Sequence, residues 1–99
     1  MAIVQPIFMD KFEEFVNGLV HGGKVKIGGV YYDYNNLKTY RDKNIIRKYI
    51  EIEDVFGNIE EAQLLSESNE VLAIQPFDIK KSADGIALAF EFKLIVTEG

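Results

Sequence analysis

Near the N-terminus, apolar residues recur at the spacing of one face of an α-helix. The stripe consists of Phe8, Phe12, Phe15, Val16 and Leu19, while Lys11, Glu13, Glu14 and Asn17 occupy the other side. We expect a helix from about residue 7 to residue 21, with Pro6 at its entry and Gly22 and Gly23 as terminators. Such a stripe binds a partner or packs onto a sheet, and we favour packing onto a sheet.

After Gly23 the spacing of apolar residues changes from the helical period to alternation, which indicates β-strands. Residues 24–34 predict a hairpin, because Gly28 and Gly29 can form the mirror-image turn that joins antiparallel strands. A short strand over residues 37–40 and a turn at residues 41–44 follow.

The second half of the chain predicts four further strands. Residues 45–53 alternate clearly, with Ile46, Ile50 and Ile52 on one side. Residues 59–65 fit a strand but also contain good helix formers, so both interpretations stay open. Residues 71–74 predict a strand that ends at Pro76 or lies at a sheet edge, and residues 86–96 alternate without a break.

This order of elements predicts the α+β class: an N-terminal amphipathic helix, then an antiparallel β-sheet or β-sandwich-like body of six to seven strands. We interpret residues 1–99 as one domain, because smaller pieces could not bury a core. The residues expected in that core are Phe12, Phe15, Leu19, Ile50, Leu88, Phe90, Phe92 and Leu94.

Composition narrows the function. The absence of cysteine excludes a disulfide scaffold, a zinc–thiolate site and a cysteine nucleophile. No apolar stretch approaches the roughly 20 residues that cross a bilayer, and the N-terminus has no secretion signal. We therefore expect a protein made in the cytoplasm, with no membrane partner.

Charge is distributed unevenly along the chain. Residues 1–23, 24–50 and 51–99 carry −2, +5 and −8, which gives the net charge of −5. An acidic chain argues against nucleic acid as a partner, although the basic residues 24–50 keep that interpretation open. We favour a basic segment that faces the acidic half, within one molecule or between neighbours.

Candidate chemistry is sparse, and the sequence predicts no catalytic residue, no metal ligand and no cofactor. His21 is the only histidine, and its position at the expected helix end favours a capping role over catalysis. The paired carboxylates match no calcium loop, and Gly22-Gly23 and Gly28-Gly29 do not have the spacing of a dinucleotide fingerprint.

Tyrosines cluster in the basic segment, where aromatic rings can stack on bases or contact another protein. We favour a protein interface. The candidate interface residues are Tyr31, Tyr32, Tyr34, Arg47 and Tyr49. Because a small chain often completes its burial by association, we also predict a homo-oligomer whose contacts include Tyr31, Tyr32 or Tyr34.

Parts of the sequence resemble bacteriophage proteins. Residues 57–65, the polar turn after them and residues 71–74 resemble a strand pair in tail-fibre and baseplate-associated proteins. The continuation through residues 79–81 and Asp84-Gly85 into residues 86–96 is similar to the strand that closes that unit. The opening Gln5–Met9 resembles small proteins encoded near tail genes of phages of Gram-positive bacteria.

The tail proteins usually place glycine near residues 68–70, where Asn69 can adopt the left-handed conformation instead. The resemblance implies a structural or assembly protein of a phage or prophage tail or baseplate, which binds other tail components and enters the virion. A second function stays open: a small bacterial regulatory or binding domain that contacts protein or nucleic acid through residues 24–50. Neither is an enzyme.

Overall fold

The computed structural model describes residues 5–35, 37–82 and 84–95. These form one helix and seven strands, which confirms the expected fold class. The elements are α1 (Pro6–Leu19), β1 (Gly22–Ile27), β2 (Val30–Tyr34), β3 (Lys38–Asp42), β4 (Ile45–Ile52), β5 (Gly57–Leu65), β6 (Val71–Lys81) and β7 (Ile86–Lys93).

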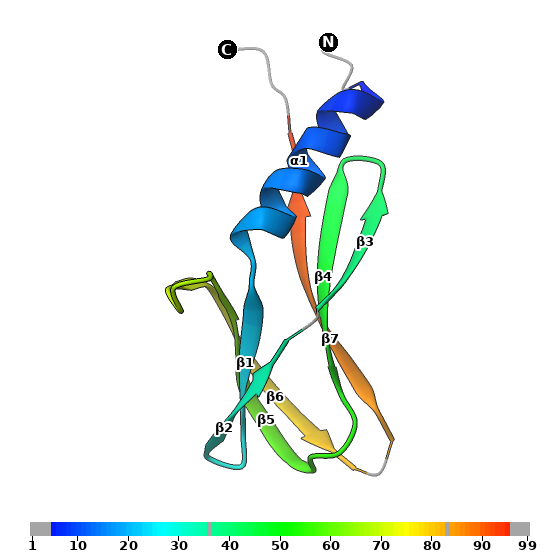
Figure 1. The fold of residues 1–99 in the computed structure, drawn as a ribbon. Coiled ribbons are helices and arrows are strands. Elements are labelled where there is room, and N and C mark those ends of the chain that lie inside the picture. The colour runs from blue at the N-terminus through cyan, green and yellow to red at the C-terminus, as the bar shows by residue number, and fades with distance from the viewer. Residues whose placement is uncertain (1–4, 36, 83, 96–99) are drawn as a thin grey trace.

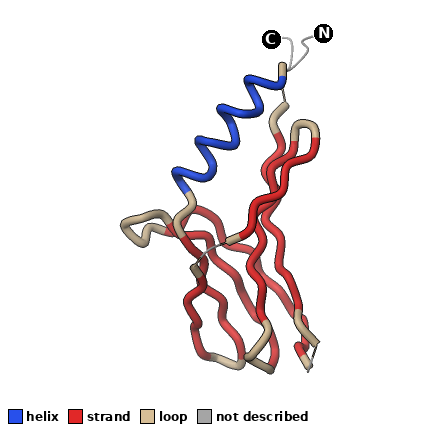
Figure 2. Tube along the Cα trace, turned by 45° about the vertical axis from the view of Figure 1, so that its right-hand side comes forward, coloured by secondary structure: helices blue, strands red, loops and turns tan. Residues whose placement is uncertain are grey.

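The strands form two antiparallel sheets, one in the order β2-β1-β5-β6 and the other in the order β3-β4-β7. β4 and β7 run the length of an elongated molecule, with α1 beside one half of them and the four-stranded sheet beside the other (Figure 1). Figure 2 shows the same division from a second direction. The three-stranded sheet is therefore the frame against which both other layers pack.

The core follows the inward face of β4 and its neighbours. Ile46, Ile50 and Ile52 of β4 are fully buried, and they join Val25, Ile59 and Leu64 of the other sheet in one cluster. Phe90 and Leu88 of β7 are also buried, as predicted, while Phe12, Phe92 and Leu94 pack partly buried against this cluster. Alternation along strands predicted this part of the core correctly.

Glycine at residues 22 and 23 has a different role from the expected one. The helix ends at Leu19, and both glycines lie in β1 without a left-handed backbone. A Cβ atom on Gly23 would lie 2.7 Å from Ile50 Cδ1, and one on Gly22 would lie 3.0 Å from the Tyr34 carbonyl oxygen. These glycines allow close approach of the two sheets and of β2, rather than terminating the helix.

The turn at Gly28-Gly29 and the turn containing Asn69 follow the sequence expectations, whereas the turn expected at residues 41–44 is confined to Lys43 and Asn44, because β3 extends to Asp42. Gly28 and Gly29 have φ values of 58° and 83° and join β1 to β2. Residues 57–65 form a strand, which settles the choice between strand and helix, and they pair with β6. Asn69, in the turn between these strands, has a φ of 64°, the left-handed conformation expected of it.

The ends of several strands differ from expectation, and β6 and β7 differ most. β6 continues through Pro76 to Lys81, as an edge strand with a register irregularity between Ile59 and Glu61 of its neighbour β5. That irregularity accommodates a residue that has no N–H to donate. β7 ends at Lys93, and Val96 lies outside the described residues.

The prediction that Phe15 and Leu19 belong to the core is wrong. Both are exposed, whereas Met9 and Val16 are the buried helix residues. The apolar arc of the helix is wide, and its edge rather than its centre faces the sheet, which leaves Phe12 only partly buried. Polar contacts with β3 and β4, described below, fix this rotation.

Substitutions of two phenylalanines test this burial. We expect Phe90→Ala to lower the free energy of unfolding by about 3–5 kcal/mol, because it leaves a cavity in the core. Phe15→Ala should cost less than about 0.5 kcal/mol, since its side chain is exposed. Urea denaturation followed by circular dichroism measures both, and equal losses would contradict the observed rotation of the helix.

Candidate functional site

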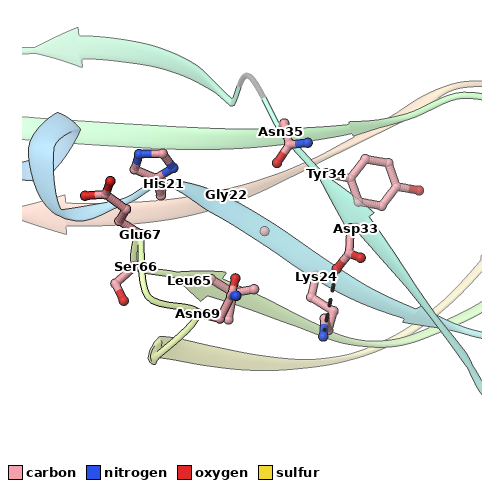
Figure 3. Close-up of a pocket in the computed structure, with 11 residues that line it drawn as sticks. His21, Gly22, Lys24, Asp33, Tyr34, Asn35, Leu65, Ser66, Glu67 and Asn69 are labelled. Atoms are coloured by element: carbon pink, nitrogen blue, oxygen red, sulfur yellow. Dashed lines mark ion pairs between the residues drawn. The ribbon is translucent and has the colours of Figure 1, made fainter.

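The sole histidine lines an open groove of about 380 Å³ at the junction of α1 and β1. Lys24, Asp33, Asn35 and Glu67 contribute polar side chains to it (Figure 3). His21 lies one residue beyond the helix C-cap Val20, and its backbone N–H donates to the Leu65 carbonyl (2.8 Å). Its backbone therefore ties the start of β1 to β5.

The serine in this groove has a turn-forming role. Ser66 Oγ accepts a hydrogen bond from the Glu70 N–H (3.1 Å) and lies 3.2 Å from Ser68 Oγ. These bonds fasten the turn between β5 and β6. Among the described residues, no group of three or more His, Cys, Asp or Glu side chains could hold a metal ion.

The five candidate interface residues do not share one surface. Tyr32 and Tyr34 alternate with Tyr31 along β2 and pack partly buried against the core, where burial is the largest cause that raises the pKa of Tyr34. Tyr31 is exposed on the outer face, with its hydroxyl 3.4 Å from Glu61 Oε2. Arg47 and Tyr49 belong to β4 in the other sheet, because the chain changes sheets between β2 and β3.

The basic segment is largely engaged within the molecule. Lys24 pairs with Asp33 (3.8 Å), Lys38 with Glu51 (3.0 Å), Arg47 with Glu91 (2.9 Å), and Arg41 with Asp10 and Glu13. The hydrogen bonds with Glu91 and Asp10 are the largest causes that raise the pKa values of Arg47 and Arg41. These pairs join the basic segment to both acidic parts of the chain.

The most unusual polar group is Lys48, which is only 5% exposed on the inward face of β4. Its ammonium donates to Asn17 Oδ1 of the helix and to Thr39 Oγ1 of β3 (2.6 Å). Thr39 Oγ1 in turn donates to Asn17 Oδ1 (3.0 Å). Burial is the largest cause that lowers the pKa of Lys48.

The helix surface turned away from this polar cluster is apolar. Ile7, Phe8, Phe15 and Leu19 are all exposed, and Phe15 is 64% accessible. We call Phe8, Phe15 and Leu19 the helix stripe, since they follow one another at intervals of seven and four residues along one side. The sequence analysis placed all three residues of the helix stripe on the apolar side of the helix, and it assigned Phe15 and Leu19 to the core.

Comparison with known proteins adds no relative: no family model, curated protein or solved structure matches the chain. Over the described residues, no helix has both the length and the apolar character required to cross a membrane. The exposed helix stripe is the candidate functional site that we infer from the structure.

Lys48→Met tests the cost of the buried ammonium. The lowered pKa means that the folded protein loses this proton at a lower pH than the unfolded chain. The wild-type free energy of unfolding should thus gain a contribution as pH rises from the lowered value to about 10.5, the ordinary pKa of lysine. Lys48→Met should lack this contribution and be at least as stable as wild type at pH 7, because a desolvated charge is removed.

Urea denaturation at several values between pH 7 and pH 11 measures both effects. Lys11→Met, which removes an exposed ammonium, is the control and should retain the wild-type pH dependence. A loss of more than about 3 kcal/mol in Lys48→Met at pH 7 would mean that the hydrogen bonds to Asn17 and Thr39 outweigh desolvation.

Proposed function

We propose that this chain is a structural or assembly protein that acts through protein–protein contacts, as a component of a phage or prophage tail or baseplate. The observation that carries the first part is the exposed helix stripe beside a helix face that is already buried. Large apolar side chains that lie in solvent along one side of a helix are typical of an interaction surface.

Energetic considerations support that role. Burying one phenylalanine or leucine side chain contributes about 1.5–3 kcal/mol, so the helix stripe offers several kcal/mol to a partner groove. Aromatic residues on an ordered helix are also suited to such contacts, because the helix supplies their positions before binding. The partners are other protein chains, copies of this one among them.

The tail assignment rests on the resemblance of residues 57–96 to tail-fibre and baseplate-associated proteins. The pairing of β5 with β6 supports it, since the resemblance is to a strand pair, and Asn69, at the point where this sequence departs from the usual glycine, has a left-handed backbone. A regulatory domain that binds nucleic acid is the second candidate, and the ion pairs of the basic segment weigh against it.

Particles released from the bacterium that encodes the chain test the assembly role. We expect the wild-type chain in gradient-purified particles, and Phe8→Ser/Phe15→Ser at a level at least about tenfold lower, because the variant lacks two exposed phenylalanines that the proposed contact would bury. Quantitative mass spectrometry of the particles measures this ratio. Phe56→Ser is the matched control, since Phe56 is 61% exposed but lies outside the helix.

Two outcomes would contradict the proposal in different ways. Absence of the wild-type chain from purified particles would remove the tail assignment. Equal incorporation of the helix double variant and the Phe56→Ser control would remove the role of the helix stripe.

Nucleic-acid binding gives an independent test. We expect no binding to DNA or RNA tighter than about 1 μM at roughly 0.15 M salt, because most basic side chains of residues 24–50 are paired with carboxylates or buried. Fluorescence anisotropy with labelled oligonucleotides measures the affinity. Tighter binding that Arg47→Ala weakens would favour the second candidate function.

A further inference from the structure

β6 is the longest strand, and it lies at the edge of the four-stranded sheet. It pairs with β5 on one side, and no strand among the described residues pairs with its other side. An edge strand presents a row of backbone N–H and C=O groups that another strand can bind. Proteins usually protect such edges with charge, proline, a bulge, short length or a covering segment, and in β6 Pro76 gives this protection only from residue 76 onward.

The other edge strands of the two sheets carry such protection. β2 is five residues long and contains Asp33, β3 contains Lys38 and Asp42, and β7 contains Glu91 and Lys93. β6 has charged residues only toward its C-terminal end, at Asp78, Lys80 and Lys81, and the run from Val71 to Phe77 before them has none. The chain as a whole has a net charge of −5, and an edge segment of this length without any charged residue is unusual within it.

Apolar side chains accompany this unprotected backbone. Ala73 packs against the core, so Leu72 and Ile74, which alternate with it, belong to the outer face. Both are exposed, as is Val71 at the start of the strand. A strand added at this edge would bury hydrocarbon and satisfy backbone groups in the same step.

We propose that this edge binds a second copy of the chain by antiparallel pairing of β6 with β6 about a two-fold axis. An uncharged strand is complementary to itself in this arrangement, because no like charges meet and the apolar residues at its centre face apolar residues of the partner, while Val71 faces the uncharged Gln75 of the partner subunit. The proposal deepens the homo-oligomer part of the proposed function and does not depend on the tail assignment.

The boundaries of the run define the register. The turn containing Asn69 precedes Val71, and Pro76 has no N–H to contribute, so the pairing segment is Val71–Gln75. Its midpoint is Ala73, which places Leu72 opposite Ile74 of the partner subunit, twice across the axis. Pairing about the two-fold axis covers the free edge of β6 in both subunits, so the assembly closes as a dimer. The β2 strands of the two subunits are then the edges of the joined sheet.

Ile74→Lys is the decisive variant, and Val30→Lys is its matched control. Ile74 is 56% exposed in β6, and Val30 is 53% exposed in β2, the opposite edge of the same sheet. We expect wild type and Val30→Lys to have twice the 11.3 kDa mass of one chain at concentrations of about 100 μM. Ile74→Lys should remain at 11.3 kDa, with the dimer dissociation constant raised at least about tenfold, because two ammonium groups would enter the apolar contact.

Size-exclusion chromatography with light scattering measures the masses, and circular dichroism checks that each variant is folded. Hydrogen exchange on the wild type provides evidence that needs no variant: exchange of the Leu72–Ile74 amides should slow as protein concentration rises.

A wild-type mass of 11.3 kDa throughout, or a dimer insensitive to Ile74→Lys, would overturn the proposal. So would equal loss of the dimer in Val30→Lys. Phe15→Ser should leave the dimer intact, so failure of the helix stripe and failure of the β6 edge are distinguishable.

Discussion

The arrangement of this small domain depends on how a buried ammonium is satisfied. Lys48 lies on the inward face of β4, between isoleucines that form the core, and it needs oxygen acceptors there. Asn17 and Thr39 supply them, which draws a polar side of α1 onto the sheet. Arg41 adds ion pairs with Asp10 and Glu13 on that side of the helix. The helix thus has its rotation set by polar contacts as well as by Met9 and Val16.

This rotation has a consequence for the molecular surface. A helix with a wide apolar arc cannot present both its polar anchors and the whole arc to one flat sheet. The anchors near Lys48 are satisfied, and the far side of the arc, with Phe8 and Phe15, remains in solvent. The exposed helix stripe is therefore a result of the polar cluster, and the same sequence feature that stabilises the helix position leaves apolar area for a partner.

Alternation along the chain predicted most of the strands, the glycine hairpin and the buried residues of β4 and β7, since these depend on local patterns, but it left residues 59–65 open between strand and helix and gave only the first part of β6. The orientation of the helix depended on Lys48, whose place in the alternation with Ile46 and Ile50 already puts it on the inward face. A lysine that alternates with inward-facing isoleucines along a strand therefore indicates a buried cation. The tyrosines could not be placed from the sequence, because the chain changes sheets between Tyr34 and Lys38, which separates residues that are neighbours along it.

The distribution of charge explains why the two apolar surfaces stand apart from the rest. Acidic and basic segments that differ strongly along the sequence meet in the folded chain, where Arg47 pairs with Glu91 and Lys38 with Glu51 on the three-stranded sheet. Such exposed pairs contribute little to stability, but they keep both charges solvated and make that face unfavourable for apolar partners. The helix stripe and the Val71–Phe77 run of β6 contain no charged residue, and they lie on separate elements, one offering side chains and the other offering backbone groups as well. Two chemically different surfaces of this kind would let a small domain bind two neighbours at once, which the proposed role as a subunit of a larger assembly requires.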